Sequence, residues 1–182
     1  MRSSGAWGEV ALGYLRERFG IEELPGKVIE RARGLWLATA DFLPEGVKVH
    51  SVGVRLFYLH DRGLKPASFG LSLLGKAIAK NKVEVKLEEL EKLLLGQTVK
   101  KPGAPEGYVA LVYRGDVIGC GKVKGDELSA EISKTRRREL LAALPWEKRA
   151  QRGAHHSSRT PSPVKWRKGL WGLGDPQERR RK

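Results

Sequence analysis

The apolar segments of this sequence that carry a helical or strand period all lie before about residue 144. From Glu147 onward, Pro, Gly, Ser, Arg and Lys dominate. A chain builds a hydrophobic core from segments that present a continuous apolar face, so the folded part is expected before that point. The hydrophobic fraction of the 182 residues is 40%, which suffices for one core of ordinary size.

Charge divides the chain at nearly the same place. Residues 134–182 hold 15 Lys and Arg against four acidic residues, a net charge of +11, whereas residues 1–133 hold 20 against 17, a net charge of +3. A polycation is drawn to a polyanion by counterion release, whatever the base sequence. We therefore interpret residues 139–182 as an extended basic tail that binds nucleic acid; a solubilising disordered tail is the alternative. The tail lacks an amphipathic period, so no membrane partner is expected.

Short periodic segments separated by glycines predict the elements of the folded part. Gly20 and Gly96 stand where helices end, and Arg114-Gly115-Asp116 is typical of a tight hairpin turn. The expected helices are 7–19, 68–80, 87–95 and 136–144. The expected strands are 27–31 and 35–39 around Arg33-Gly34, one or two strands within 47–59 with a break at Gly53, and 83–85, 108–113, 117–123 and 127–132; turns are expected at 44–46, 63–66 and 101–107.

This mixture of short strands and small helices predicts an α+β fold with a small barrel-like sheet. The sequence has one cysteine, Cys120, so an internal disulfide is excluded. This residue is expected to be a small buried hydrophobe within a hairpin. No P-loop or Ser-His-Asp order is present, and the pair His155-His156 lacks further ligands. We expect no catalytic residue, metal or cofactor.

Other features bear on the chain's environment. The N-terminal residues lack the apolar stretch of a signal peptide, and no apolar run approaches the roughly 20 residues of a membrane span. A cytoplasmic protein is expected. Asn81 is the single asparagine among many charged residues, a thermophile-like bias.

Four motifs occur in an order that resembles a known domain. They are Gly63-Leu64-Lys65-Pro66, Leu94-Leu95-Gly96-Gln97, Gly107-Tyr108-Val109 and Ile118-Gly119-Cys120-Gly121-Lys122-Val123. This order resembles the C-terminal PUA-like domain of RsmF-type enzymes, in the Nol/Nop/Sun family of RNA 5-methylcytosine methyltransferases. The resemblance implies a PUA-like mixed β pseudo-barrel with short flanking helices at 45–138, a helix and hairpin at 1–44 before it, and the basic tail at 139–182.

The sequence departs from that family in two ways. Ser129 and Ala130 stand where the family carries Lys-Asn, and Ser133 stands where it carries Pro. About 45 residues precede the matching region, too few for the doubly wound domain that holds S-adenosylmethionine in family members. A stand-alone, non-catalytic domain is therefore expected.

Basic residues and interleaved tryptophans mark the expected RNA contacts. Lys65, Lys122 and Lys124 match basic positions implied by the resemblance, and exposed tryptophans between cations offer stacking for bases. Trp146 either stacks in this way or packs on the folded domain. The remaining expected contacts are Lys134, Arg136, Arg137 and Arg138 after the last strand, and Lys148, Arg149, Arg152, Lys165, Trp166, Arg167, Lys168 and Trp171 in the tail.

Three functional hypotheses follow. The first is an RNA-binding protein that acts on rRNA, with tRNA as another possible target, as a ribosomal or ribosome-associated component. The second is an accessory subunit that presents RNA to a separately encoded RNA methyltransferase. The third is an RNA-modifying enzyme whose site the sequence does not reveal.

Overall fold

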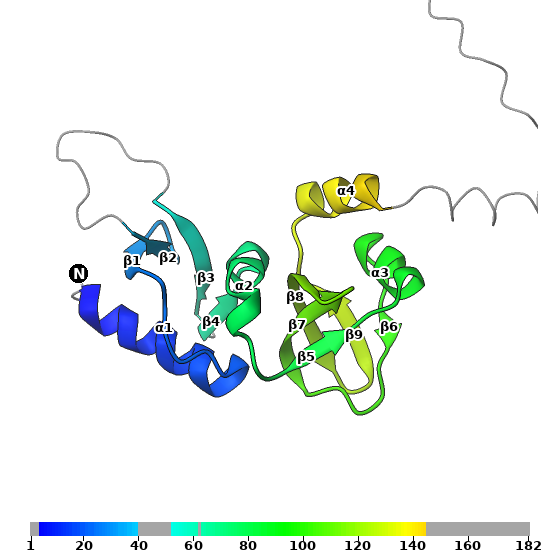
Figure 1. Cartoon of the computed structure of the whole chain (residues 1–182), viewed down its shortest axis with the longest axis horizontal. Coiled ribbons are helices and arrows are strands. Elements are labelled where there is room, and N and C mark those ends of the chain that lie inside the picture. The colour runs from blue at the N-terminus through cyan, green and yellow to red at the C-terminus, as the bar shows by residue number, and fades with distance from the viewer. Residues whose placement is uncertain (1–3, 40–51, 62, 145–182) are drawn as a thin grey trace, which may run out of the picture. The chain divides into compact units, whose positions relative to one another are not determined.

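The computed structural model describes residues 4–39, 52–61 and 63–144, which contain two sheets (Figure 1). The first sheet has the order β1-β2-β3-β4, and all its pairs are antiparallel. Its strands are β1 (Lys27–Arg31), β2 (Gly34–Ala38), β3 (Val54–His60) and β4 (Gly63–Pro66). The boundary expected at residue 44, the turn at 44–46, the start of the strand segment at 47 and the tail from residue 145 lie outside the described residues.

The second sheet is curled and has the order β5-β7-β8-β9-β6. Its strands are β5 (Lys82–Glu84), β6 (Val99–Lys100), β7 (Gly107–Tyr113), β8 (Asp116–Lys124) and β9 (Glu127–Ala130). The helices are α1 (Ser4–Phe19), α2 (Ser68–Leu73), the 3-10 turn η1 (Gly75–Ala77), α3 (Leu87–Leu94) and α4 (Lys134–Ala143). The predicted α+β fold with a mixed, partly closed barrel is confirmed. No helix among the described residues has the length and apolar character to cross a bilayer.

The first core lies between α1 and the first sheet. Ala11, Leu15 and Phe19 recur at helical spacing and are buried, where they join Leu35 and Phe57 of the sheet. Gly20 follows the helix with a φ of +68°, a left-handed conformation that glycine adopts without a steric cost. The helix predicted at residues 7–19 and its end at glycine are therefore confirmed.

The first hairpin is confirmed, but its turn lies one residue earlier than predicted. Arg31 pairs with Gly34, so the two turn residues are Ala32 and Arg33, with φ values of +47° and +55°. A two-residue turn with positive φ at both positions matches the twist of the strands that it joins. The glycine belongs to the strand instead.

Gly63–Pro66 is a strand, and its prediction as a turn was wrong. It pairs with β3, with His60 opposite Gly63 and Phe57 opposite Pro66. Pro66 is tolerated because β4 is an edge strand, where a missing backbone N–H need not interrupt a ladder.

The helix predicted at 68–80 is shorter than expected. α2 ends at Leu73 and a 3-10 turn follows. The glycines of this segment serve close packing: a Cβ at Gly75 would lie 3.0 Å from Val117 Cβ, and one at Gly70 would lie 2.7 Å from the carbonyl oxygen of Arg55. Glycine has a low helix propensity, so the residues that permit this close packing also disfavour a longer helix.

The β7–β8 hairpin is shared between two cores. Its turn residues, Arg114 and Gly115, both have positive φ, as predicted from the sequence. Side chains alternate along the ribbon: Ala110 and Cys120 join the first core, whereas Val109 and Leu111 join a second core with α3. The hairpin therefore links the packing of both halves of the described chain.

Candidate nucleic-acid interface

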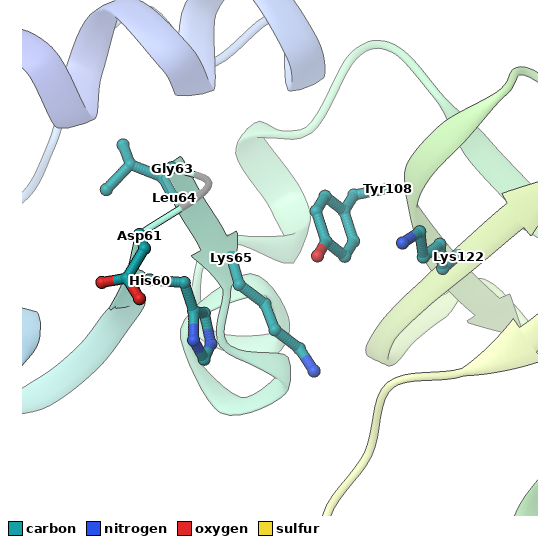
Figure 2. A pocket seen from close by; sticks show the side chains of 7 residues that line it. All are labelled: His60, Asp61, Gly63, Leu64, Lys65, Tyr108 and Lys122. Carbon is teal, nitrogen blue, oxygen red and sulfur yellow. The ribbon is translucent and has the colours of Figure 1, made fainter.

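An open pocket of about 560 Å³ lies where β3 and β4 meet the β7–β8 hairpin. Its volume falls in the range of small-ligand sites. Figure 2 shows the side chains of His60, Lys65, Tyr108 and Lys122 across it in that order. The lining residues are His60, Asp61, Gly63, Leu64, Lys65, Tyr108 and Lys122.

The hairpin register places Tyr108 and Lys122 in the pocket. These two residues are directly opposite one another, and the buried pair Ala110 and Cys120 follows on the same face. The ammonium of Lys122 lies 5.5 Å from the centre of the Tyr108 ring. One hairpin face therefore begins as core and ends as an aromatic ring beside a cation, an arrangement that suits an anionic ligand with an apolar face.

Arg18, at the end of α1, positions the backbone of Tyr108. Its Nε donates a hydrogen bond to the Tyr108 carbonyl at 2.6 Å, and a second nitrogen donates to the carbonyl of Glu106. Gly107, between these two residues, has a φ of +92°, and a Cβ there would lie 3.1 Å from Arg18 Nη2. Hydrogen bonds from Arg18, which lies 90 residues before Tyr108 in the sequence, thus fix the start of β7.

Lys65, which lines the pocket, forms an ion pair with Glu131. Its Nζ lies 2.5 Å from Glu131 Oε2, and both side chains are largely buried. Burial alone would lower the pKa of Lys65, but the hydrogen bond and charge of Glu131 outweigh it and raise the pKa. Lys65 therefore carries a charge that Glu131 partly neutralises, and a phosphate would have to compete with this carboxylate.

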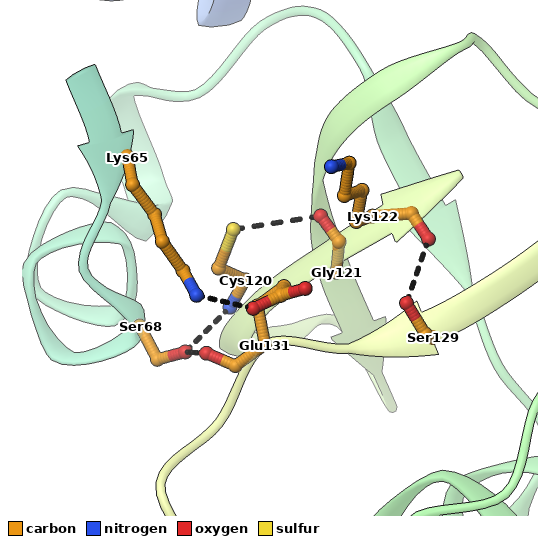
Figure 3. A network of polar contacts seen from close by, with 7 residues as sticks. All are labelled: Lys65, Ser68, Cys120, Gly121, Lys122, Ser129 and Glu131. Carbon is orange, nitrogen blue, oxygen red and sulfur yellow. Dashed lines mark hydrogen bonds and ion pairs between the residues drawn. The ribbon is translucent and has the colours of Figure 1, made fainter. Parts of the chain in front are cut away.

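Ser68 and Cys120 continue this network (Figure 3). The Ser68 hydroxyl donates to the Glu131 carbonyl at 2.8 Å and accepts from the Cys120 backbone N–H at 3.0 Å. Cys120 is fully buried, and burial raises the pKa of its thiol to about 12. The thiol is therefore protonated at neutral pH and unsuited to nucleophilic attack.

Two serines that replace family residues have local structural roles. The Ser129 hydroxyl donates to the carbonyl of Lys122 at 3.2 Å, across the β8–β9 pair. Ser133 caps α4, because its hydroxyl accepts from the Arg136 N–H at 3.3 Å. Both substitutions thus bear on backbone that carries expected RNA contacts.

The cations of α4 form a second group. α4 packs against α3, and Arg137 lies beside Gly96 at the end of that helix, with Nη1 2.9 Å from the position of a Cβ there. A cation at a helix C-terminus is favourable, so Arg137 has a structural role. Arg136 pairs with Glu139 at 3.0 Å, and Lys134 and Arg138 are exposed.

The structure brings together only part of the set expected from sequence. Lys65 and Lys122 share the pocket, and Lys124 is exposed two residues further along β8. His60 and Tyr108 were not expected; the signal for Tyr108 was its alternation with buried Ala110. Among residues 4–39, 52–61 and 63–144, no three or more His, Cys, Asp or Glu side chains gather as metal ligands. The expected contacts outside the described residues are Lys148, Arg149, Arg152, Lys165, Trp166, Arg167, Lys168 and Trp171.

Comparison with known proteins finds a matching domain family and a curated relative. Residues 80–138 match the family described as the methyltransferase RsmF PUA domain. The ribosomal RNA small subunit methyltransferase F of Psychromonas ingrahamii is 26% identical over 136 residues, which make up 70% of this chain and 27% of that protein. The chain thus spans about a quarter of the length of this curated relative. The expected resemblance to an RsmF-type PUA domain is confirmed.

Proposed function

We propose that this protein binds RNA through the pocket formed by His60, Lys65, Tyr108 and Lys122. The observation that carries the proposal is the gathering of two ammonium groups and two rings around one open pocket, partly within the region that matches a PUA domain. Ammonium groups attract phosphates and rings stack on bases. The buried, protonated thiol of Cys120 is unsuited to act as a nucleophile.

Ribosomal RNA is the target that we propose. The curated relative is a ribosomal RNA methyltransferase by name, and the net charge of +14 favours an extended polyanion. The relative's name also supports a second candidate, in which the protein presents RNA to a methyltransferase. Sedimentation with ribosomal subunits is expected for the first candidate, and a stable complex with a catalytic protein for the second.

Charge reversal at Lys122 tests the binding site. Lys122→Glu should weaken binding of the full chain to an rRNA fragment. It should also reduce the slope of log affinity against log salt concentration by about one, because one phosphate contact is lost. Lys82→Glu is the matched control, because Lys82 is also an exposed strand lysine of the second sheet but lies outside the pocket. Equal losses in both variants would show that only net charge matters and that the pocket is not the site.

A further inference from the structure

A row of stacked aromatic and cationic side chains lies on the first sheet, on the face opposite α1. The Arg55 guanidinium carbon lies 4.3 Å from the centre of the Trp36 ring and 4.8 Å from that of Tyr58. The rings of Tyr58 and His60 are 6.4 Å apart. We call Trp36, Arg55, Tyr58 and His60 the stacked row. Tyr58 is 37% exposed and His60 is also exposed, so the row ends in two accessible rings.

A β-bulge creates this row. Regular alternation along β3 would place Arg55 on the same face as Phe57, which is fully buried in the first core. The register shifts between Leu35 opposite Phe57 and Trp36 opposite Arg55, so Leu56 is the extra residue and is buried as well. The bulge turns Arg55 to the outer face beside Trp36, in the way that bulges commonly redirect side chains.

Gly34 provides the space in which Arg55 lies. It pairs with Tyr58, and a Cβ at this position would lie 3.1 Å from Arg55 Nε and 3.4 Å from Trp36 Nε1. The Nε of Arg55 is buried and has no hydrogen-bond partner among the described residues. The guanidinium lies against the rings of Trp36 and Tyr58.

The stacked row is continuous with the proposed binding pocket. His60 belongs to both, and Tyr58 is directly opposite Lys65 in the β3–β4 register. One surface thus runs from Trp36 to Lys122 and alternates rings with cations. This composition suits a single strand whose bases expose their faces to rings and whose phosphates pair with the cations. A duplex fits this surface less well, because its base faces are covered by stacking within the helix. An apolar protein segment also fits less well, because it would bury the charge of Arg55 without supplying a counter-charge.

We propose that the stacked row is a platform on which bases of single-stranded RNA stack, extending the pocket onto the first sheet. This inference rests on the proposed function, because it concerns the same ligand. It assigns a binding role to strands that precede the PUA-matching residues 80–138. Tyr58 and His60 are the residues expected to contact bases. Arg55 and Trp36 are expected to support the two exposed rings.

Substitution of the exposed rings tests the platform. Tyr58→Ala and His60→Ala, each in the full chain, should weaken binding to a single-stranded oligonucleotide of rRNA sequence about five- to a hundredfold, the range expected for one lost base stack. Affinity for the duplex of the same sequence and the salt slope should not change, because stacking releases no counterions. Tyr58→Phe should retain single-strand affinity, since it keeps the ring face.

Tyr113→Ala is the matched control. Tyr113 also stacks with an arginine, Arg114, at 5.3 Å, but at the tip of the β7–β8 hairpin, so it should leave RNA affinity unchanged. Tyr58 lies outside the pocket lining, so Tyr58→Ala separates the two proposals. If Tyr58→Ala keeps its single-strand affinity while Lys122→Glu weakens RNA binding, the platform is wrong and the proposed function stands. Equal losses of affinity for single strand and duplex would also overturn the platform, because they would show that the rings have a structural role. If the wild-type protein binds no RNA, the proposed function itself fails.

Discussion

Gly107 is the residue at which backbone conformation and long-range anchoring coincide. It combines a φ of +92° with the close approach of Arg18, whose hydrogen bonds hold Tyr108. A side chain there would strain the backbone and also push the guanidinium away from its two carbonyl acceptors. Local strain of this kind persists only when neighbouring contacts impose it.

Gly107→Ala should therefore lower the free energy of unfolding by about 1–3 kcal/mol and weaken RNA binding, because Tyr108 shifts. Gly103→Ala is the control: its φ is +77°, and a Cβ there meets no described atom within 4 Å. It shares the backbone strain but not the crowding. Denaturant unfolding of both variants checks the prediction, which fails if Gly103→Ala costs as much as Gly107→Ala.

A residue-level expectation from sequence is confirmed where the cause is local, whereas contacts between distant residues were not foreseen. Cys120 was expected to be buried because it alternates within an apolar hairpin strand, and it is. Lys65 stays an expected RNA contact, and its ion pair with Glu131, which is far away in the sequence, was not foreseen. His60 gave no signal, since only the pairing of β3 with β4 brings it to the pocket.

Among the elements, the first hairpin has a turn whose two residues do not favour its backbone conformation. Ala32 and Arg33 both adopt positive φ, which costs free energy for residues with a Cβ. Replacing them with Asn-Gly, the preferred pair for this turn, should raise the free energy of unfolding by about 1 kcal/mol. Within the part of the chain that the structure describes, the Arg33 side chain pairs with a highly exposed Asp61 at 3.6 Å, so little is lost.

Thermal and denaturant unfolding of the Asn-Gly variant check this prediction. Gly115→Ala in the other two-residue turn, where φ is +87°, should change stability in the opposite direction. An Asn-Gly variant that is less stable than wild type would show that Arg33 contributes more than its exposed ion pair indicates.

Elements with a local cause were predicted well. α1 and α3 have apolar periodicity and a terminal glycine, and the β7–β8 hairpin has a turn signal, so each was expected from sequence. β4, the two-residue strand β6 and the shortened α2 were missed or misassigned, because edge pairing and glycine-mediated packing involve distant residues. The bulge at Leu56 likewise depends on pairing with β2.

For the whole molecule, the separation of apolar and basic segments predicts separate contributions to stability and affinity. The described cores use residues up to Leu144, while residues 145–182 hold 11 Lys and Arg against three acidic residues, a net charge of +8. A protein of residues 1–144 should therefore fold with nearly unchanged thermal stability. Its affinity for RNA should fall and depend less on salt, because most phosphate contacts are expected in the tail.

Thermal unfolding and RNA binding at several salt concentrations, measured on residues 1–144 and on the full chain, check this division. A truncated protein that does not fold would show that residues 145–182 contribute to a core. An unchanged salt slope would show that the tail contributes few phosphate contacts.

The shared β7–β8 hairpin has a consequence for dissecting this protein. The region recognised as a PUA domain begins at residue 80, yet Ala110 and Cys120 within it are buried by α1, α2 and the first sheet. A fragment cut at that sequence boundary would expose this apolar face to water and tend to self-associate. The segment matched by the family and the unit that can fold alone thus have different limits here, so a fragment or domain graft that is meant to fold should begin at α1.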